Sequence, residues 1–349
     1  MHVYLISYAF WAAIGYLARA RKHSLALAAV FSVFLVVFMG TRFMVGCDTK
    51  SYAMRYELKY QGVGWIEAVR EGEGLFNWLN MALIKLGASY NALLVVCALI
   101  FVGCLYRFAM VYRQPLSVMV LGFPVLVIQL GMSGLRQALA TAFLMVAYAV
   151  FTKGRRWSVA AWILLASQFH TSSIIFLPIA LLAGKRVSAV RLMASMMLLS
   201  PVVSWFLGMR LEVYSDRYVE QVYGENSSSG AWFRYVLVLI PFLVLEWKRR
   251  LVEQRHPEIY ELLRLFALVT FALAVVGLVS SVALHRLVFY VMPVSIVALL
   301  CVADSIFRRD NRPIAIAIPF LAYGAYVLMW FTLSKHSAAC YVPYQSWLL

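Results

Sequence analysis

The chain has 349 residues, of which 64% are hydrophobic and only 13% are charged. Water-soluble domains carry about 45–50% apolar and about 25% charged residues, so this composition excludes an ordinary soluble fold. Lysine and arginine number 31 against 15 aspartate and glutamate residues. In a membrane protein such a surplus, gathered in short clusters between apolar segments, sets orientation, so it does not indicate a nucleic-acid partner.

Apolar runs of membrane-spanning length recur along the chain, since a transmembrane helix needs about 20 residues to cross about 30 Å of hydrocarbon. The first run is followed by Arg19, Arg21 and Lys22 rather than by a small-residue cleavage site, so we expect it to remain as a span. In chain order, the predicted spans are approximately residues 3–18, 24–41, 90–107, 115–132, 136–152, 189–207, 232–247, 262–282, 286–304 and 313–333.

Basic clusters between these spans predict the topology. The positive-inside rule assigns to the cytoplasm the clusters at residues 19–22, 107–113, 153–156, 185–191, 248–255 and 308–312. The alternation of sides then places outside the N-terminus, residues 42–72, the turns near Ser133 and His285, the loop at 209–231 and the C-terminal tail. In a bacterium the outside is the periplasm, so we expect a multi-pass protein of the inner membrane. The 209–231 loop is long for a connection and is predicted to cover or bind at a site.

Two stretches do not fit a single crossing. Residues 75–86 contain asparagine and lysine and are too short to cross, so we expect an interfacial or re-entrant helix. Residues 157–183 form one long run, but a single crossing would put Lys185 on the wrong side; two short helices that meet near His170 restore the parity. Backbone broken within the membrane must be buried in protein or line a watery cavity.

The prediction for the fold is therefore all-α. We expect a single integral membrane domain over residues 1–349, with periplasmic segments near 42–73 and 209–231. It is predicted to form a transmembrane helical bundle of about 12 passes around an outward-facing cavity.

The cysteines indicate no structural metal site, because the sequence contains no CxxC or Cys/His spacing. Cys97, Cys104 and Cys301 lie inside apolar runs, where a small buried side chain is the ordinary interpretation. Cys47 and Cys340 fall in segments predicted to lie outside, where disulfides form. The sequence leaves open whether these two residues pair.

Arginines gather at the predicted outer ends of spans, at Arg42, Arg136, Arg234 and Arg286. A charged group at this depth normally faces protein or a water-filled cleft, although each one alone also fits a side chain that snorkels to the interface. Guanidinium groups bind phosphate oxygens through planar, bidentate hydrogen bonds. Together, these arginines predict a site for an anionic lipid head group such as a lipid pyrophosphate.

Chemistry on a sugar hydroxyl needs a base beside such an anion site. Asp48 and Glu73 are the best-placed outer carboxylates, although Glu73 directly precedes the predicted helix at 75–86 and also fits a helix cap. His170 is the one histidine in the interior of an apolar run, and it fits either a neutral buried side chain or a base with a reference pKa of about 6.5. No HExxH, GxSxG, Walker A or GxGxxG motif occurs, which argues against metalloprotease, hydrolase, NTPase and dinucleotide chemistry.

Several short segments follow one another along the chain in a recognisable order. They are RFMVGCDTKSY (42–52), EGLFNWLN (73–80), SGLRQALA (133–140), FHTSS (169–173), SDRYVEQVY (215–223), HRLVFY (285–290) and VPYQS (342–346). In order and spacing these segments resemble the EpsG family, which belongs with the Wzy-type polymerases of bacterial surface polysaccharides. The resemblance covers almost the whole chain.

The resemblance implies an inner-membrane glycosyltransferase, similar to the O-antigen ligases, that joins repeat units carried on undecaprenyl pyrophosphate at the periplasmic face. It implies a GT-C-like arrangement of the helices, no metal and no other cofactor. The implied partners are the lipid-linked oligosaccharide, membrane lipids, a chain-length regulator and a flippase.

The resemblance also implies roles for the outer residues. Pyrophosphate binding falls to Arg136, Arg286, Arg42 and Arg234; the role of base to His170, Asp48 or Glu73; and sugar binding to Gln137, Tyr52, Arg217, Tyr223 and His285. The tyrosines equally fit the aromatic belt that lines a membrane interface.

Two other interpretations stay open. A transporter or flippase for lipid-linked sugars would also place arginines and a broken helix around a site, but it predicts two matched halves. A membrane O-acyltransferase would use a buried histidine such as His170, but its acyl donor would have to arrive from the cytoplasmic side, opposite to the predicted topology.

Overall fold

The computed structural model describes residues 1–349 apart from 19, 59–63, 71–72, 209–228, 308–311 and 349. Regular structure in the described residues is helical, with one isolated antiparallel bridge between Arg42 and Ser346. Seven described segments are long and apolar enough to cross a bilayer: Arg21–Gly40, Tyr90–Ala109, Ala189–Gly208, Gly230–Trp247, Pro257–Val279, Ser281–Ile306 and Ile314–Leu333. The protein is therefore an all-α, multi-pass membrane protein, which confirms the predicted class.

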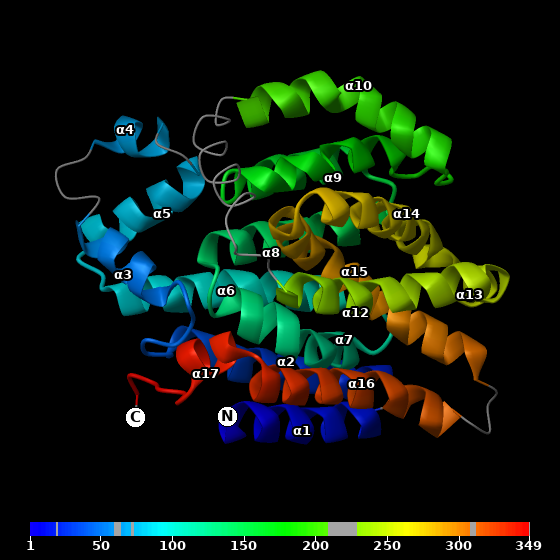
Figure 1. The fold of residues 1–349 in the computed structure, drawn as a ribbon, viewed down its shortest axis with the longest axis horizontal. Helices are drawn as coiled ribbons and strands as arrows, with labels where there is room; N and C mark the ends of the chain where they lie inside the picture. The colour runs from blue at the N-terminus through cyan, green and yellow to red at the C-terminus, as the bar shows by residue number, and fades with distance from the viewer. Residues whose placement is uncertain (19, 59–63, 71–72, 209–228, 308–311, 349) are drawn as a thin grey trace. The chain divides into compact units, whose positions relative to one another are not determined.

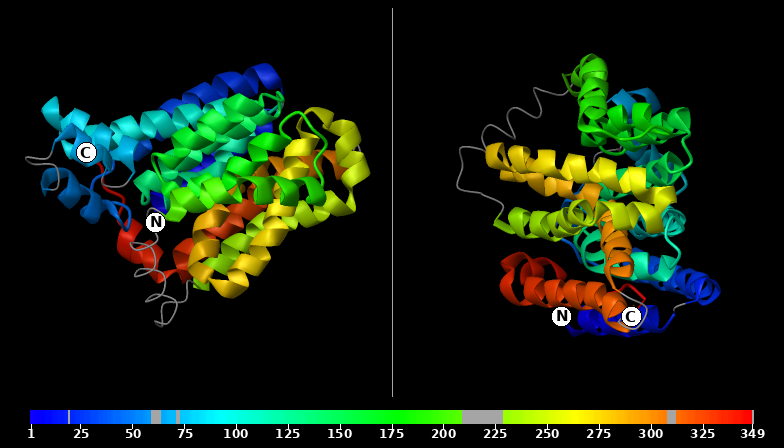
Figure 2. Two further views of the ribbon diagram at one scale, coloured as in Figure 1. Left: turned by 90° about the horizontal axis from the view of Figure 1, so that it is seen from above. Right: turned by 90° about the vertical axis from the view of Figure 1, so that its right-hand side faces the viewer.

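The described chain divides into two compact units, and the first contains Met1–Val146, Leu165–His170 and Ile316–Leu349. Its helices, wholly or in part, are α1 (His2–Leu17), α2 (Arg21–Gly40), α3 (Thr49–Leu58), α4 (Trp65–Arg70), α5 (Gly74–Lys85), α6 (Tyr90–Ala109), α7 (Pro115–Gly122), η1 (Phe123–Gly131), α8 (Leu135–Phe151), α16 (Arg312–Leu333) and α17 (Lys335–Tyr341). Helices α1 and α16 lie side by side (Figures 1 and 2), and the Tyr8 hydroxyl donates to the carbonyl of Phe320 at 2.6 Å.

Aromatic side chains form much of the packing in the first unit. Trp11 of α1 contacts Phe31 of α2, with ring centroids 4.6 Å apart, and Phe38 packs on Phe123 of η1 at 5.5 Å. Lipid tails are as apolar as these side chains, so close van der Waals packing rather than exclusion of water holds such helices together. This packing fixes the end of α2, from which residues 41–48 lead to α3.

The predicted span at 115–132 is α-helical only as far as Gly122, after which η1 is a π-helix. Pro124 at its start has no backbone N–H to donate, which favours a change of helical register. Gln129 is hydrogen-bonded to two other helices. The hydroxyl of Tyr326 donates to its side-chain oxygen, and the hydroxyl of Tyr341 donates to its backbone carbonyl. The π-helix ends at Gly131, directly before the turn that precedes α8.

The second unit contains Ala147–Leu164 and Thr171–Ala315. Its helices, wholly or in part, are α9 (Arg156–Ser167), η2 (Thr171–Leu182), α10 (Ala189–Gly208), α12 (Ser229–Trp247), α13 (Arg249–Arg255), α14 (Pro257–Val279) and α15 (Ser281–Ile306). Helices α12, α14 and α15 pack together: the Tyr235 hydroxyl donates to the carbonyl of Thr270 at 2.9 Å, and that of Ser295 to Val238 at 3.1 Å.

The predicted interruption at His170 is confirmed. Helix α9 ends at Ser167, and the 3-10 helix η2 begins at Thr171 and contains Pro178. The predicted short helix at 75–86 is also present, as α5 with 12 residues. Besides the seven long helices, the described residues include shorter apolar helices at His2–Leu17, Pro115–Gly131, Leu135–Phe151 and Thr171–Leu182. The count of about 12 passes stays a prediction.

The turn predicted near His285 is wrong in position. Helix α14 runs to Val279, and α15 begins at Ser281 and contains both His285 and Arg286. Ser280 separates the two helices, and its hydroxyl accepts a hydrogen bond from the N–H of Ala283 at 3.2 Å. This N-cap stabilises a helix start that lies several residues before His285 and Arg286.

Gly46 is a position where only glycine fits. Its φ is +109°, and a Cβ placed there would collide with the carbonyl oxygen of Met132. We expect Gly46→Ala to lower the free energy of unfolding by about 1–3 kcal/mol, because both the backbone conformation and the close approach become strained. The thermal midpoint in detergent should fall, whereas Gly103→Ala, in open space on α6, should keep or raise it. A wild-type midpoint for Gly46→Ala would contradict this account.

Candidate functional site

Glu73 joins two of the predicted site residues in the first unit. Its Oε1 lies 3.0 Å from Nδ1 of His170, and its Oε2 lies 2.6 Å from Nη1 of Arg136. The side chain of Glu73 is 7% exposed and that of Arg136 is 29% exposed. The three residues therefore form a continuous and mostly buried polar cluster.

Each member of the cluster lies at the end of a helix. Glu73 directly precedes α5, but its side chain makes no cap hydrogen bond to that helix. The carboxylate is instead directed to His170 and Arg136, so Glu73 does not cap α5 through its side chain. Arg136 is the second residue of α8, and His170 lies in the break between α9 and η2. The break is held near α5, since the N–H of Phe76 donates to the carbonyl of Gln168 at 3.5 Å.

The charge state of the cluster follows from its contacts. Burial by itself raises the pKa of the Glu73 carboxyl, but the hydrogen bond to His170 and the charge of Arg136 outweigh it, so the pKa falls from 4.5 to about 2. An ionised carboxylate can only accept hydrogen bonds, so the shared proton belongs to Nδ1 of His170. In the neutral imidazole the lone pair is then on Nε2, the atom that can take up a proton.

Tyr52 and Asp48 extend the cluster from α3. The Tyr52 hydroxyl accepts from Nε of Arg136 at 3.4 Å and from its backbone N–H at 3.5 Å. Asp48 lies at the start of α3 and exchanges hydrogen bonds with Ser133, whose hydroxyl is 3.2 Å from Oδ2. Tyr52 thus orients Arg136 in this structure. The contact of Ser133 with Asp48 was not predicted from the sequence. The position of Ser133 shortly before Arg136 was the available signal.

Arg42 lies in a closed, largely apolar part of the first unit. It is 1% exposed, and it lies among Leu94, Phe101 and Leu139. Its Nη1 donates to the carbonyl of Met39 near the end of α2, and its Nε and Nη2 have no hydrogen-bond partner in the described part of the chain. Arg42 therefore holds the C-terminal end of α2 in this structure, and its sequence-predicted contact with pyrophosphate would need a rearrangement.

The other predicted residues lie elsewhere. In the second unit, Arg234 is buried, its Nη1 lies 3.2 Å from Nε2 of His285, and its guanidinium lies 4.9 Å from the ring centroid of Phe289. Because arginine can only donate, Nε2 of His285 is the acceptor. Arg286 is half-buried in α15, and Gln137 is half-buried in α8 of the first unit. Arg217 and Tyr223 lie outside the described residues.

One group of potential metal ligands occurs among the described residues, formed by Cys47, His336 and Cys340. Cys47 and Cys340 are joined as a disulfide, with Cα atoms 4.8 Å apart, which settles the pairing that the sequence left open. Thiolates are the metal ligands of cysteine, so the bonded sulfurs are not available for that role.

The pKa of Glu73 predicts a pH dependence of stability. A carboxyl group with a lowered folded-state pKa stabilises the fold fully above its unfolded value of 4.5, and this stabilisation is lost as the pH falls towards about 2. The loss over that window should amount to about 3 kcal/mol. Unfolding midpoints in detergent between these pH values should decline for the wild type and decline less for Glu73→Gln. Glu67→Gln, at an exposed position on α4, should keep the wild-type slope; equal slopes for both variants would contradict the assignment.

Comparisons with known proteins bear on the family. No curated protein and no solved structure matches the chain. The EpsG family matches residues 25–346, which include Glu73, Arg136 and His170. This match extends over nearly the whole chain and confirms the resemblance noted in the sequence. The protein therefore belongs to the EpsG family, which is associated with exopolysaccharide biosynthesis.

Proposed function

We propose that the protein is a polysaccharide polymerase: a glycosyltransferase that joins oligosaccharide repeat units carried on undecaprenyl pyrophosphate at the periplasmic face of the bacterial inner membrane. The observation that carries this proposal is the bridge of Glu73 between His170 and Arg136. It combines a base, a carboxylate that orients the base and a cation in one cluster. Family membership and the positive-inside topology support the substrate class and the side of the membrane.

His170 acts as the base in this proposal. The hydroxyl of the acceptor sugar attacks the anomeric carbon of the donor chain, and Nε2 of His170 accepts the hydroxyl proton. The charge of Glu73 stabilises the imidazolium that forms and fixes its tautomer through Nδ1, as the carboxylate does in a Ser-His-Asp triad. Glu73 itself is a weak base because its pKa is about 2. Asp48, which is exposed and bonded to Ser133, is assigned a supporting role.

Arg136 acts on the leaving group. As the new glycosidic bond forms, the bond from the anomeric carbon to the pyrophosphate oxygen breaks, and undecaprenyl pyrophosphate departs with the electron pair. Nη2 of Arg136 makes no hydrogen bond to the described residues, and 29% of the side chain is exposed. Nη2 can therefore donate a hydrogen bond to a phosphate oxygen. Neutralising this developing charge in a buried setting stabilises the transition state.

The test is elongation by the purified protein. Undecaprenyl-pyrophosphate-linked oligosaccharide incubated with the protein in detergent, with chelator and without nucleotide, should give a ladder of longer glycans. A flippase would instead redistribute the lipid-linked sugar between the leaflets of vesicles without forming bonds. Redistribution with unchanged glycan length in proteoliposomes would overturn the proposal in favour of transport.

A further inference from the structure

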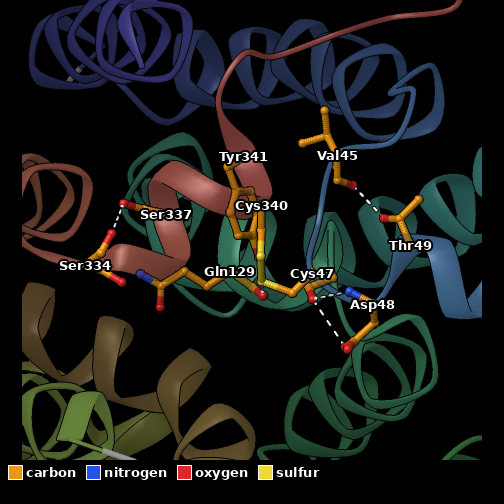
Figure 3. The surroundings of a disulfide bond; sticks show 10 residues. Val45, Cys47, Asp48, Thr49, Gln129, Ser334, Ser337, Cys340 and Tyr341 are labelled. Carbon is orange, nitrogen blue, oxygen red and sulfur yellow. Dashed lines mark hydrogen bonds between the residues drawn. A yellow bond between two sulfur atoms is a disulfide. The ribbon is translucent and has the colours of Figure 1, made fainter.

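In the first unit, the segment between α2 and α3 is joined to the C-terminal residues by several independent contacts. Cys47 is bonded to Cys340 of α17 (Figure 3), and the N–H of Gly46 donates to the carbonyl of Cys340 at 2.8 Å. The N–H of Phe43 donates to the carbonyl of Gln345 at 2.9 Å. Helix α17 is itself anchored through Tyr341, whose carbonyl accepts from Tyr4 at 2.9 Å.

The same segment leads directly into the site. The turn before α3 is closed by Thr49, whose hydroxyl donates to the carbonyl of Val45 at 2.7 Å (Figure 3). The N–H of Tyr52 then donates to the carbonyl of Asp48 at 3.0 Å in the first turn of α3. This turn sets where the Tyr52 hydroxyl meets Arg136. The disulfide thus lies five residues before the hydroxyl that orients the cation of the site.

We propose that the Cys47–Cys340 disulfide is a positioning element of the site, which holds Asp48 against Ser133 and Tyr52 against Arg136, so that the transfer rate depends on the thiol–disulfide state of the tail. This inference rests on the proposed function, because it assigns Arg136 to the reaction. A dithiol reductant would convert the disulfide to two thiols with two electrons and two protons, and would itself become a disulfide. Arg136 would keep Glu73 but lose its fixed orientation, and small displacements of a reacting group lower rates steeply.

Kinetics of Cys340→Ser test the proposal. We expect kcat per folded molecule to fall at least about tenfold, while the KM for the donor changes by less than about twofold, because binding groups remain and their alignment is lost. Dithiol treatment should lower the wild-type rate to the same level and leave the variant unchanged. Cys104→Ser, at a half-buried free cysteine of α6, should keep the wild-type kcat. Unchanged kcat in Cys340→Ser would overturn the proposal.

A double-mutant cycle separates positioning from general weakening of the fold. If the disulfide acts through Tyr52, then Tyr52→Phe should cost much less activity in the Cys340→Ser background than in the wild type. Additive losses would show that the disulfide acts elsewhere.

Hydrogen exchange tests the inference without any enzymatic readout. Amides of residues 48–53 should exchange at least about tenfold faster after reduction, whereas those in the middle of α6 should not change. Unchanged exchange overturns the positioning role even if the protein elongates glycans. Faster exchange in a protein that never elongates supports the positioning role and instead removes the proposed function.

Discussion

His170→Ala is expected to lower the elongation rate constant by roughly 10²- to 10⁴-fold, the usual contribution of a general base. The expectation follows from the contact between Nδ1 of His170 and the ionised Glu73 at 3.0 Å, which directs the basic nitrogen Nε2 away from the carboxylate. Rates are to be measured under single-turnover conditions with saturating donor and acceptor. The amount of folded protein in detergent should stay close to that of the wild type.

Glu73→Gln probes the same step from the other side of the hydrogen bond. It removes the charge that stabilises the imidazolium, so we expect a loss of roughly a hundredfold or more. Because the two residues act as a unit, the double variant should be scarcely slower than His170→Ala alone. His23→Ala, at an exposed histidine of α2, and Glu67→Gln serve as matched controls. Near-normal rates for His170→Ala would remove the assignment of the base and shift attention to Asp48.

Arg136→Ala is expected to have two separable effects. The loss of a cation that acts on the leaving pyrophosphate should lower kcat by roughly 10²- to 10³-fold. The same change leaves the buried Glu73 carboxylate without its 2.6 Å ion pair, so the thermal midpoint should fall as well. Arg136→Lys keeps the charge but loses the planar fork that reaches both Tyr52 and Glu73, so it should be intermediate in both measurements.

A second substitution separates these effects. Adding Glu73→Gln to Arg136→Ala removes the uncompensated buried charge, so the midpoint should recover while elongation stays low. Arg107→Ala, at an exposed arginine of α6, should behave as the wild type in both measurements. If stability and rate recovered together in the double variant, Arg136 would be a structural residue and not one that acts on pyrophosphate.

The positions of the long helices could be predicted from sequence because apolar length is a local property. The span predicted at 189–207 corresponds to α10 (Ala189–Gly208), and that at 313–333 to α16 (Arg312–Leu333). The break at His170 was not local, but the parity of basic clusters required it. Helix ends that depend on a single cap residue were harder to predict from the sequence. Ser280 caps α15, so this helix begins before His285 and not after it.

The geometry of the candidate site could not be predicted in the same way. Glu73 is 63 residues from Arg136 and 97 residues from His170 in sequence, and no periodicity links them. The sequence named all three residues but left His170, Asp48 and Glu73 as competing bases. The structure supplies the contacts that give them different roles in our proposal. For Arg42 the prediction and the structure differ. Its position after an apolar run predicted a side chain at the membrane interface, whereas the structure buries it.

The stoichiometry of a single turnover tests the central claim most directly. Donor lipid labelled in its pyrophosphate and acceptor labelled in its sugar are mixed with excess protein, and both products are followed in time. We predict one undecaprenyl pyrophosphate released for each new glycosidic bond, at equal rates, with both products suppressed in His170→Ala and Arg136→Ala. Release of pyrophosphate lipid without bond formation, or bond formation at wild-type rates in those variants, would contradict transfer by the cluster that Glu73 holds together.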